Sequence, residues 1–177
     1  FGTNMYAASS TSWEFLKFLT PIPDSGIARY EFEQDVTDSW NSNDLSLSGG
    51  TFTTDSSVGS YALSLDGADD EASGTASPSG NISFTGWIRN PSGASGRDFW
   101  FGTPDVYSGV QSNGTLFSRT QNGSNNVGST NGAIRGEGWK FVAVTVDSGS
   151  SITQYVDGSQ DDSFSISESI DFSGTIR

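Results

Sequence analysis

The stretch WKFVAVTVDSGSSITQYVDG, residues 139–158, contains two runs of alternating residues around a Ser/Gly turn. Val142, Val144 and Val146 share one face of the first run, and the residues between them are also mostly apolar. A strand that is apolar on nearly both faces belongs in the middle of a sheet. The second run ends in an Asp-Gly pair at 157–158, a common hairpin signal. The sequence therefore predicts that this hairpin belongs to the scaffold and that the functional residues lie in loops or on a sheet face.

The same period of two recurs outward from this hairpin, in short runs separated by clusters of Gly, Ser, Asn and Asp. The further runs are IARYEFE (27–33), YALSLD (61–66), NISFTGWIR (81–89), RDFWFG (97–102), TLFSR (115–119) and SFSIS (163–167). Many short strands at regular spacing predict an all-β protein, an antiparallel β-sandwich. Residues 112–132 are predicted as a hairpin and a long loop.

One segment has the period of a helix: TSWEFLKFLT, residues 11–20. Thr11 and Glu14 have capping-box spacing, and Pro21 ends the pattern. We therefore expect an N-terminal segment over 1–26, with one short helix and a Pro-containing linker, and a sandwich domain over 27–177. The apolar stripe of the helix packs either on its own domain or on a protein partner.

The charge balance limits the partners of the chain. Its 21 acidic and 8 basic residues give a net charge of -13, which disfavours nucleic acid. Such acidity is typical of a halophilic source, and an ordinary acidic extracellular protein is the alternative. Both interpretations place the chain outside the cytoplasm, on a cell surface, in the medium or on a virion. No run of 18 apolar residues predicts membrane insertion.

The chain contains no His and no Cys. This composition excludes disulfides, thiol nucleophiles, Ser-His and Cys-His dyads and imidazole metal ligands. Most hydrolase mechanisms are therefore excluded, and carboxylate chemistry remains.

Four segments resemble, in order, parts of the laminin G-like and concanavalin A-like jelly rolls. They are ARYEFEQDVTDSWNSND (28–44), YALSLDGADD (61–70), ISFTGWIR (82–89) and the hairpin at 139–158. The resemblance implies binding of carbohydrate or glycoprotein, often with calcium, or polysaccharide hydrolysis in the glucanase branch. It also implies a closing strand that pairs with the first strand. Residues 170–176 or a segment outside this chain would supply that strand.

Hydrolysis would need two carboxylates on one strand face, and Glu31, Glu33 and Asp35 have that alternation. The resemblance places them on the first strand, whereas the catalytic strand of the glucanases lies in the middle of a sheet. We therefore predict that the chain is not an enzyme and that it is a recognition or adhesion module for glycans or glycosylated surfaces. A structural component of a virion or surface assembly and a polysaccharide hydrolase are the alternatives. A homo-oligomer is left open.

Calcium takes six to eight oxygen ligands, and three acidic loops could supply them. The resemblance favours the first, Asp35, Asp38, Asn43 and Asp44. The others are Asp66, Asp69, Asp70 and Glu71, and Asp157, Asp161 and Asp162. Acidic loops that merely hold water and cations are the alternative.

Sugar recognition requires exposed aromatic rings. The resemblance assigns Trp87 and Trp139 to core strands. The predicted ligand-binding residues are therefore Trp40, Trp100 and Tyr107, with packing in the core as the alternative for each.

Overall fold

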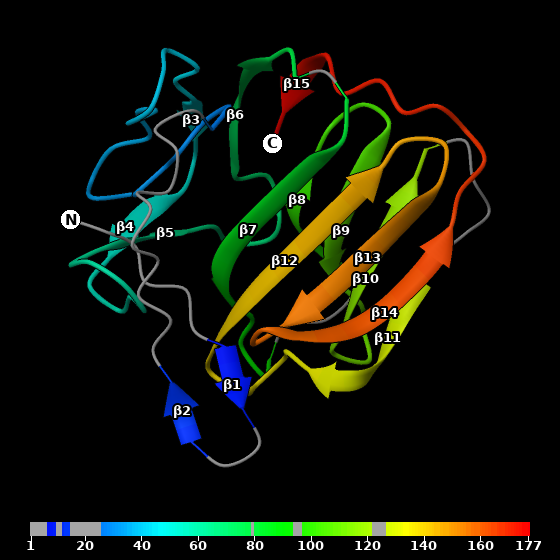
Figure 1. Ribbon diagram of the computed structural model, residues 1–177. Helices are drawn as coiled ribbons and strands as arrows, with labels where there is room; N and C mark the ends of the chain where they lie inside the picture. Colours follow the sequence, from blue (N-terminus) through cyan, green and yellow to red (C-terminus); the bar gives the residue numbers. More distant parts are fainter. Residues whose placement is uncertain (1–6, 10–11, 15–25, 79, 94–96, 122–126) are drawn as a thin grey trace.

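A computed structural model describes residues 7–9, 12–14, 26–78, 80–93, 97–121 and 127–177 (Figure 1). The described residues form strands and connecting turns, and no helix among them could span a membrane. The strands are β1 (Ala7–Ser9), β2 (Ser12–Glu14), β3 (Ser46–Ser48), β4 (Thr51–Thr53), β5 (Ala62–Ser64), β6 (Glu71–Ala76), β7 (Ile82–Arg89), β8 (Asp98–Gly102), β9 (Val106–Val110), β10 (Thr115–Thr120), β11 (Val127–Ala133), β12 (Trp139–Asp147), β13 (Ser151–Val156), β14 (Ser159–Ser165) and β15 (Gly174–Ile176).

Two antiparallel four-stranded sheets form the body of the protein and confirm the predicted jelly-roll sandwich. Their strand orders are β14-β13-β12-β7 and β11-β10-β9-β8. Figure 1 shows the second sheet behind the first. Apolar side chains from the inner faces of both sheets fill the space between them. These buried residues include Ile82, Phe84, Val106, Val110, Leu116, Val142, Val144, Val146 and Ile152.

The hairpin at 139–158 forms as predicted. Strand β12 lies between β7 and β13, and Val142, Val144 and Val146 are all buried. The backbone N–H of Ser150 donates to the carbonyl of Asp147 over 2.9 Å and closes the turn. Asp157 and Gly158 have φ of 49° and 81°, the left-handed conformation of a tight hairpin turn that leads into β14.

The C-terminal residues complete the domain. Ile170, Phe172 and Ile176 are buried against the core. Strand β15 pairs with β6, which also pairs with β3 on its other edge. Residues 170–176 therefore supply a closing strand within this chain, although its partner is β6 and not the segment at 27–33. Strands β4 and β5 form a separate hairpin.

Two elements differ from the sequence predictions. The run at 27–33 is no strand: Tyr30 makes one isolated bridge to Asp38, and Phe32 and Gln34 have φ of 56° and 70°. These left-handed residues break the alternation, so Tyr30 and Phe32 stack on each other with ring centroids 6.1 Å apart. The helix predicted over 11–20 lies mostly outside the described residues. Its described part, Ser12–Glu14, is strand β2, because it pairs with β1 in a local hairpin.

Candidate functional site

The outer face of the sheet β14-β13-β12-β7 presents two tryptophans. Ile82 and Phe84 point into the core from β7, so Trp87 points outward, where 43% of it is exposed. On β12, Val142 points inward and Trp139 outward. Trp139 lies directly opposite Arg89 across the strand pair. The ring of Phe141 packs edge-on against Trp87, with centroids 5.6 Å apart.

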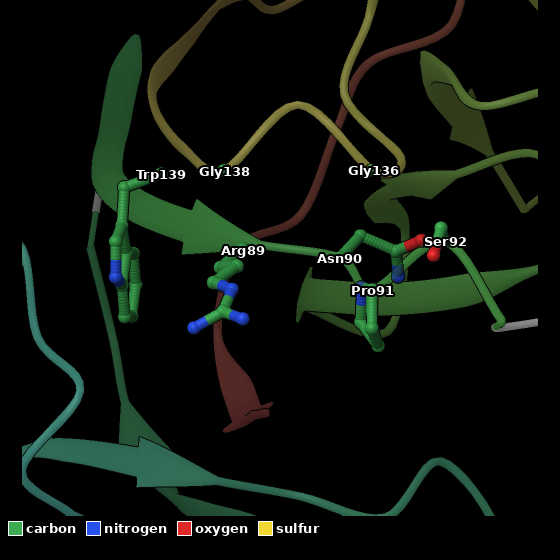
Figure 2. A pocket seen from close by; sticks show the side chains of 7 residues that line it. All are labelled: Arg89, Asn90, Pro91, Ser92, Gly136, Gly138 and Trp139. Atoms are coloured by element: carbon green, nitrogen blue, oxygen red, sulfur yellow. The ribbon is translucent and has the colours of Figure 1, made fainter.

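A hollow of about 380 Å³, here called the Trp139 pocket, opens at the end of β7 (Figure 2). Figure 2 shows Trp139 and Arg89 next to each other, with the loop of Gly136 and Gly138 running above the pocket. The lining residues are Arg89, Asn90, Pro91, Ser92, Gly136, Gly138 and Trp139. An aromatic ring thus stands beside a guanidinium, an amide and a hydroxyl.

Asp55, from the loop after β4, fixes the two largest side chains of the pocket. Its carboxylate accepts a hydrogen bond of 3.0 Å from the indole N–H of Trp139. The same carboxylate forms an ion pair with Arg89. The carboxylate therefore orients the ring and the guanidinium together, and the positions of both depend on one residue.

A buried polar network supports the floor of the pocket. The Oδ1 of Asn90 accepts a hydrogen bond of 2.7 Å from Nε of Arg135, and its Nδ2 donates to Asp98 over 2.9 Å. Arg135 also forms an ion pair of 2.7 Å with Asp98. The backbone carbonyl of Asn90 accepts a hydrogen bond of 2.8 Å from Gly136 N–H. These contacts join the ends of β7 and β11 to the start of β8, so the pocket is held by both sheets.

The chemistry of the Trp139 pocket suits recognition of a neutral polar ligand. A ring for stacking and fixed hydrogen-bonding groups are what a sugar-binding hollow requires. Among the lining residues, all of which are described, there is no carboxylate. The pocket therefore lacks the pair of acids that glycoside hydrolysis uses.

The three predicted ligand-binding residues lie in three different places. Trp100 packs against both core clusters, as in the core-packing alternative. Trp40 is half-buried over Gly26 in the loop after Tyr30. Tyr107 lies on the outer face of β9, in contact with Phe99. The structure does not bring the three together.

Sequence reasoning missed the exposed Trp87 and the half-buried Trp139 as candidates on the outer face of the sheet, although the signal was present. Both were correctly placed on strands but were assigned to the core. The alternation that puts Val142 inward also puts Trp139 outward, and Ile82 fixes the direction of Trp87 in the same way.

In the first acidic loop, the Asp38 carboxylate organises the backbone. Its Oδ1 accepts the N–H groups of Arg29 and Trp40, each over 2.9 Å. Its Oδ2 accepts the backbone and side-chain N–H groups of Asn43 over 3.2 and 3.1 Å. Burial acts to raise the pKa of Asp38, but these hydrogen bonds outweigh it and lower the pKa from 3.8 to about 2.

The carboxylates predicted as calcium ligands in this loop therefore already accept hydrogen bonds from the loop itself. Asp44 accepts the N–H of Asp38 over 2.8 Å, and Asp35 accepts hydrogen bonds from Thr37. Within the described residues, the carboxylate oxygens of Asp35, Asp38 and Asp44 do not converge as a metal-ligating group. Calcium at this loop stays a prediction from the sequence.

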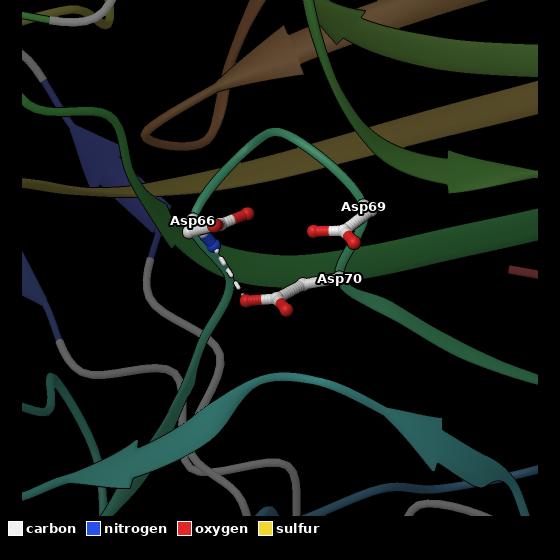
Figure 3. A group of neighbouring side chains, drawn as sticks. All are labelled: Asp66, Asp69 and Asp70. Atoms are coloured by element: carbon white, nitrogen blue, oxygen red, sulfur yellow. Dashed lines mark hydrogen bonds between the residues drawn. The ribbon is translucent and has the colours of Figure 1, made fainter.

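The second acidic loop has a more open arrangement (Figure 3). One carboxylate oxygen from each of Asp66, Asp69 and Asp70 lies within 4.8 Å of the others. Asp70 also accepts the N–H of Asp66 over 2.9 Å. This donor set suits a hard cation such as calcium, which prefers carboxylate oxygens.

In the third acidic loop, Asp157 forms an ion pair of 2.8 Å with Lys140 and accepts the N–H of Phe141. Asp162 accepts the N–H of Ser163. These carboxylates stabilise the turn between β13 and β14.

The two glutamates of the hydrolase alternative are also engaged. Glu31 forms an ion pair of 2.8 Å with Arg29. Glu33 accepts the backbone N–H of Ser60 over 2.8 Å. They do not lie on a common strand, because the segment has left-handed residues at Phe32 and Gln34. The arrangement of a nucleophile beside a general acid is absent from this described segment.

Comparison with known proteins extends this description. A family profile described as Concanavalin A-like lectin/glucanases superfamily matches residues 66–176. A search of curated protein sequences finds no match.

Several solved structures share the fold. The binding domain of Paraclostridial Mosquitocidal Protein 1 has a TM-score of 0.65 at 18% identity, over 81% of this chain and 41% of that chain. A structure of botulinum neurotoxin type C has a TM-score of 0.58 at 17% identity, over 85% of this chain and 41% of that chain. The cell entry of that toxin is described as dependent upon interaction with two ganglioside molecules. The binding domain of botulinum neurotoxin DC in complex with SialylT has a TM-score of 0.60 at 18% identity, over 85% and 41%. This chain thus spans about two fifths of those chains.

Proposed function

Because the chain belongs to the concanavalin A-like lectin/glucanase superfamily, we propose that it is a non-catalytic module that binds glycans or glycoproteins outside the cell. The observation that carries this proposal is the Trp139 pocket with the exposed Trp87 beside it on the same sheet face. Trp87 and Trp139 would stack against sugar rings, while Arg89, Asn90 and Ser92 would hydrogen-bond to hydroxyl groups.

The comparisons support this proposal at the level of fold. Two of the three similar structures are described as binding domains, and two of the descriptions mention gangliosides or SialylT. At 17–18% identity they share architecture with this chain, so the sugar itself must be found by experiment.

The hydrolase alternative is weaker, for reasons of geometry. No carboxylate lines the Trp139 pocket, and Glu31 and Glu33 are bound to Arg29 and Ser60. Incubation with β-glucans and an assay of reducing ends tests this directly. Product that disappears in Glu33→Gln would establish hydrolysis and overturn the non-catalytic proposal.

The test of glycan binding is a glycan array with the labelled chain, followed by titration of the sugars retained. Trp87→Ala and Trp139→Ala should each lower the affinity by about tenfold or more, because each removes a stacking surface. Val58→Ala is the matched control, since Val58 is also an exposed apolar residue but lies outside the pocket. Far-ultraviolet circular dichroism checks that all variants fold.

Two outcomes would count against the proposal. One is an array without any retained glycan. The other is retention that survives both tryptophan substitutions, which would remove the pocket as its site.

Calcium stays a prediction from the sequence. The converging carboxylates of Asp66, Asp69 and Asp70 support the second loop, whereas the resemblance favours the loop around Asp38. Calorimetric titration of calcium into the wild-type chain, Asp69→Asn and Asp38→Asn separates the two loops. If Asp69→Asn abolishes the heat of calcium binding and Asp38→Asn does not, the ion binds at the second loop.

A halophilic source and a role on the virion of a halophilic virus belong to the same proposal. The net charge of -13 with 8 basic residues favours them. Thermal unfolding in 0.1 and 3 M NaCl tests the halophilic source. At molar salt the Debye length is only about 3 Å, so the repulsion between carboxylates is largely screened. A melting temperature that does not rise with salt would argue for an ordinary acidic extracellular protein. The sequence also suggested that residues 11–20 bind a protein partner, and that segment lies mostly outside the described residues.

A further inference from the structure

A second aromatic surface lies on the opposite side of the sandwich. Phe99, Tyr107 and Phe117 project from the outer faces of β8, β9 and β10, because Val106, Val110 and Leu116 point inward. The ring of Phe99 meets Tyr107 and Phe117 edge-on, with centroids 5.4 and 5.6 Å apart. Phe117 is buried beneath its neighbours, whereas 57% of Phe99 is exposed.

Gly109 makes this arrangement possible. It lies on β9 directly opposite Phe99 on one side and Phe117 on the other. A Cβ at Gly109 would lie 2.8 Å from the Phe117 ring and 2.3 Å from the carbonyl oxygen of Asp98. The missing side chain lets the Phe117 ring cross β9 and support Phe99 from below.

Two arginines complete the surface, which we call the Phe99 face: Arg97, Phe99, Tyr107, Phe117 and Arg119. The guanidinium carbon of Arg97 lies 5.3 Å from the centre of the Phe117 ring. That of Arg119 lies 5.3 Å from the centre of the Tyr107 ring. Both contacts are within the range of cation–π attraction.

The charges of the Phe99 face are unusual for this chain. The described residues include seven of the eight Lys and Arg, and five of these seven form ion pairs with carboxylates. The two without a carboxylate partner among the described residues are Arg97 and Arg119. The Nε of Arg119 is buried and has no hydrogen-bond acceptor there. In a chain with 21 acidic residues, the positive charge that lacks a carboxylate partner within the described part is thus concentrated on one aromatic surface.

This combination selects for an anion that also has an apolar face. A guanidinium binds carboxylate and sulfate groups by paired, charge-assisted hydrogen bonds. An exposed Phe ring offers a surface for the C–H face of a sugar. An acidic peptide would also seek backbone partners, but β9 and β10 are each paired along both edges. On the edge strand β8, Gly102 already exchanges backbone hydrogen bonds with Arg177. Two arginines on a strongly acidic protein are too few for nucleic acid.

We propose that the Phe99 face is a second binding site, for saccharides that carry a carboxylate or a sulfate group. This inference rests on the proposed function of glycan binding, and it deepens that function by naming an acidic sugar and a separate surface. Arg97 and Arg119 bind the anionic group, and Phe99 packs against the sugar ring. Tyr107, predicted from the sequence as a ligand residue, holds Arg119 and Phe99 in place.

The test is titration of the full chain with three probes in 0.15 M NaCl: sialyllactose for a carboxylate, a sulfated chondroitin oligosaccharide for a sulfate, and lactose as the neutral reference. At least one acidic probe should bind about tenfold more tightly than lactose, as expected for hydrogen bonds to a charged group. Arg97→Gln, Arg119→Gln and Phe99→Ala should abolish that preference. Arg29→Gln is the matched control, because it removes one positive charge outside the Phe99 face.

Separate variants distinguish the two sites. Trp87→Ala weakens binding at the Trp139 pocket but should leave the affinity of the Phe99 face for the acidic probes as it is in the wild-type chain, so a failure at the Trp139 pocket would not be mistaken for a failure at the Phe99 face. Equal affinity for acidic and neutral probes would overturn this inference. A preference that survives Arg97→Gln, which replaces an exposed side chain and so preserves folding, would overturn it as well.

Discussion

Gln154 on β13 donates a hydrogen bond of 2.7 Å through its Nε2 to the hydroxyl of Ser118 on β10. Both residues are completely buried between the two sheets. Ser118 donates in turn to Ser108 over 3.1 Å, and Ser108 donates to the carbonyl of Phe117 over 2.8 Å. A chain of polar groups therefore crosses an otherwise apolar core and fixes the position of one sheet relative to the other.

Ser118→Ala should lower the free energy of unfolding by about 1–3 kcal/mol, because it leaves the buried amide of Gln154 without a partner. The double variant Ser118→Ala with Gln154→Leu should recover much of this loss, since both polar groups are then gone. Urea unfolding followed by tryptophan fluorescence measures both. Additive losses in the double variant would show that the two side chains are energetically independent.

Arg135→Ala should be among the more damaging surface-loop substitutions, with a loss of about 3–5 kcal/mol, because it leaves the Asp98 charge and Asn90 without their partner. Arg29→Ala removes an exposed ion pair with Glu31 and should cost less than about 1 kcal/mol. Chemical denaturation of the two variants compares them. Equal losses would contradict a structural role for the network under the Trp139 pocket.

Gly109→Ala should destabilise the sandwich by about 1–3 kcal/mol, since the added methyl group would overlap the Asp98 carbonyl and the Phe117 ring. Gly93→Ala is the control, because no atom is found among the described residues within 4 Å of the position of its Cβ. Thermal unfolding of both variants is the measurement. The control should unfold at the wild-type temperature.

Asp38 should contribute to acid stability. Its pKa is lowered in the folded protein to about 2, so the unfolded chain binds a proton more readily. The stabilisation is therefore present above about pH 4, the ordinary range of an unfolded Asp, and is lost as pH falls toward 2. Asp38→Asn keeps the shape and removes the titration, so its unfolding free energy should fall less steeply between pH 4 and pH 2. Parallel pH profiles for the variant and the wild type would rule out this role.

The period-two runs between 61 and 167 predicted strands well, because hydrophobic alternation reports directly which face of a strand is buried. The segment at 27–33 has the same alternation but is no strand. There Asp38 binds the local backbone, and its hydrogen bonds replace a sheet ladder. The hairpin predicted within residues 112–132 corresponds to the antiparallel pair of β10 and β11. The bounds of β11 could not be predicted, because Val127–Ala133 is mostly Gly, Ser, Thr and Asn, and pairing with β10 decides its conformation.

The candidate sites were harder to predict. Alternation determines that Trp87 and Trp139 face outward, but it does not reveal that Asp55 and Asn90, far apart in sequence, meet around them. Alternation alone would put Phe99 and Phe101 on one face and Trp100 on the other, but a bulge between Phe99 and Phe101 lets both Trp100 and Phe101 pack against the core. Pairings between distant strands, and irregularities within one strand, are the information that a local pattern lacks.

The two arginines of the Phe99 face also bear on how fast the protein would attach to a surface coated with acidic sugars. At long range such a surface repels this protein in every orientation, because the net charge of the chain is -13. Attraction by Arg97 and Arg119 acts at close contact, and ions in solution weaken it less than the distant repulsion, which fades over about 10 Å at 0.1 M ionic strength. Adding moderate salt would therefore increase the rate of attachment, whereas it would lower that rate for a basic lectin. Only collisions in which the Phe99 face meets the surface would lead to attachment.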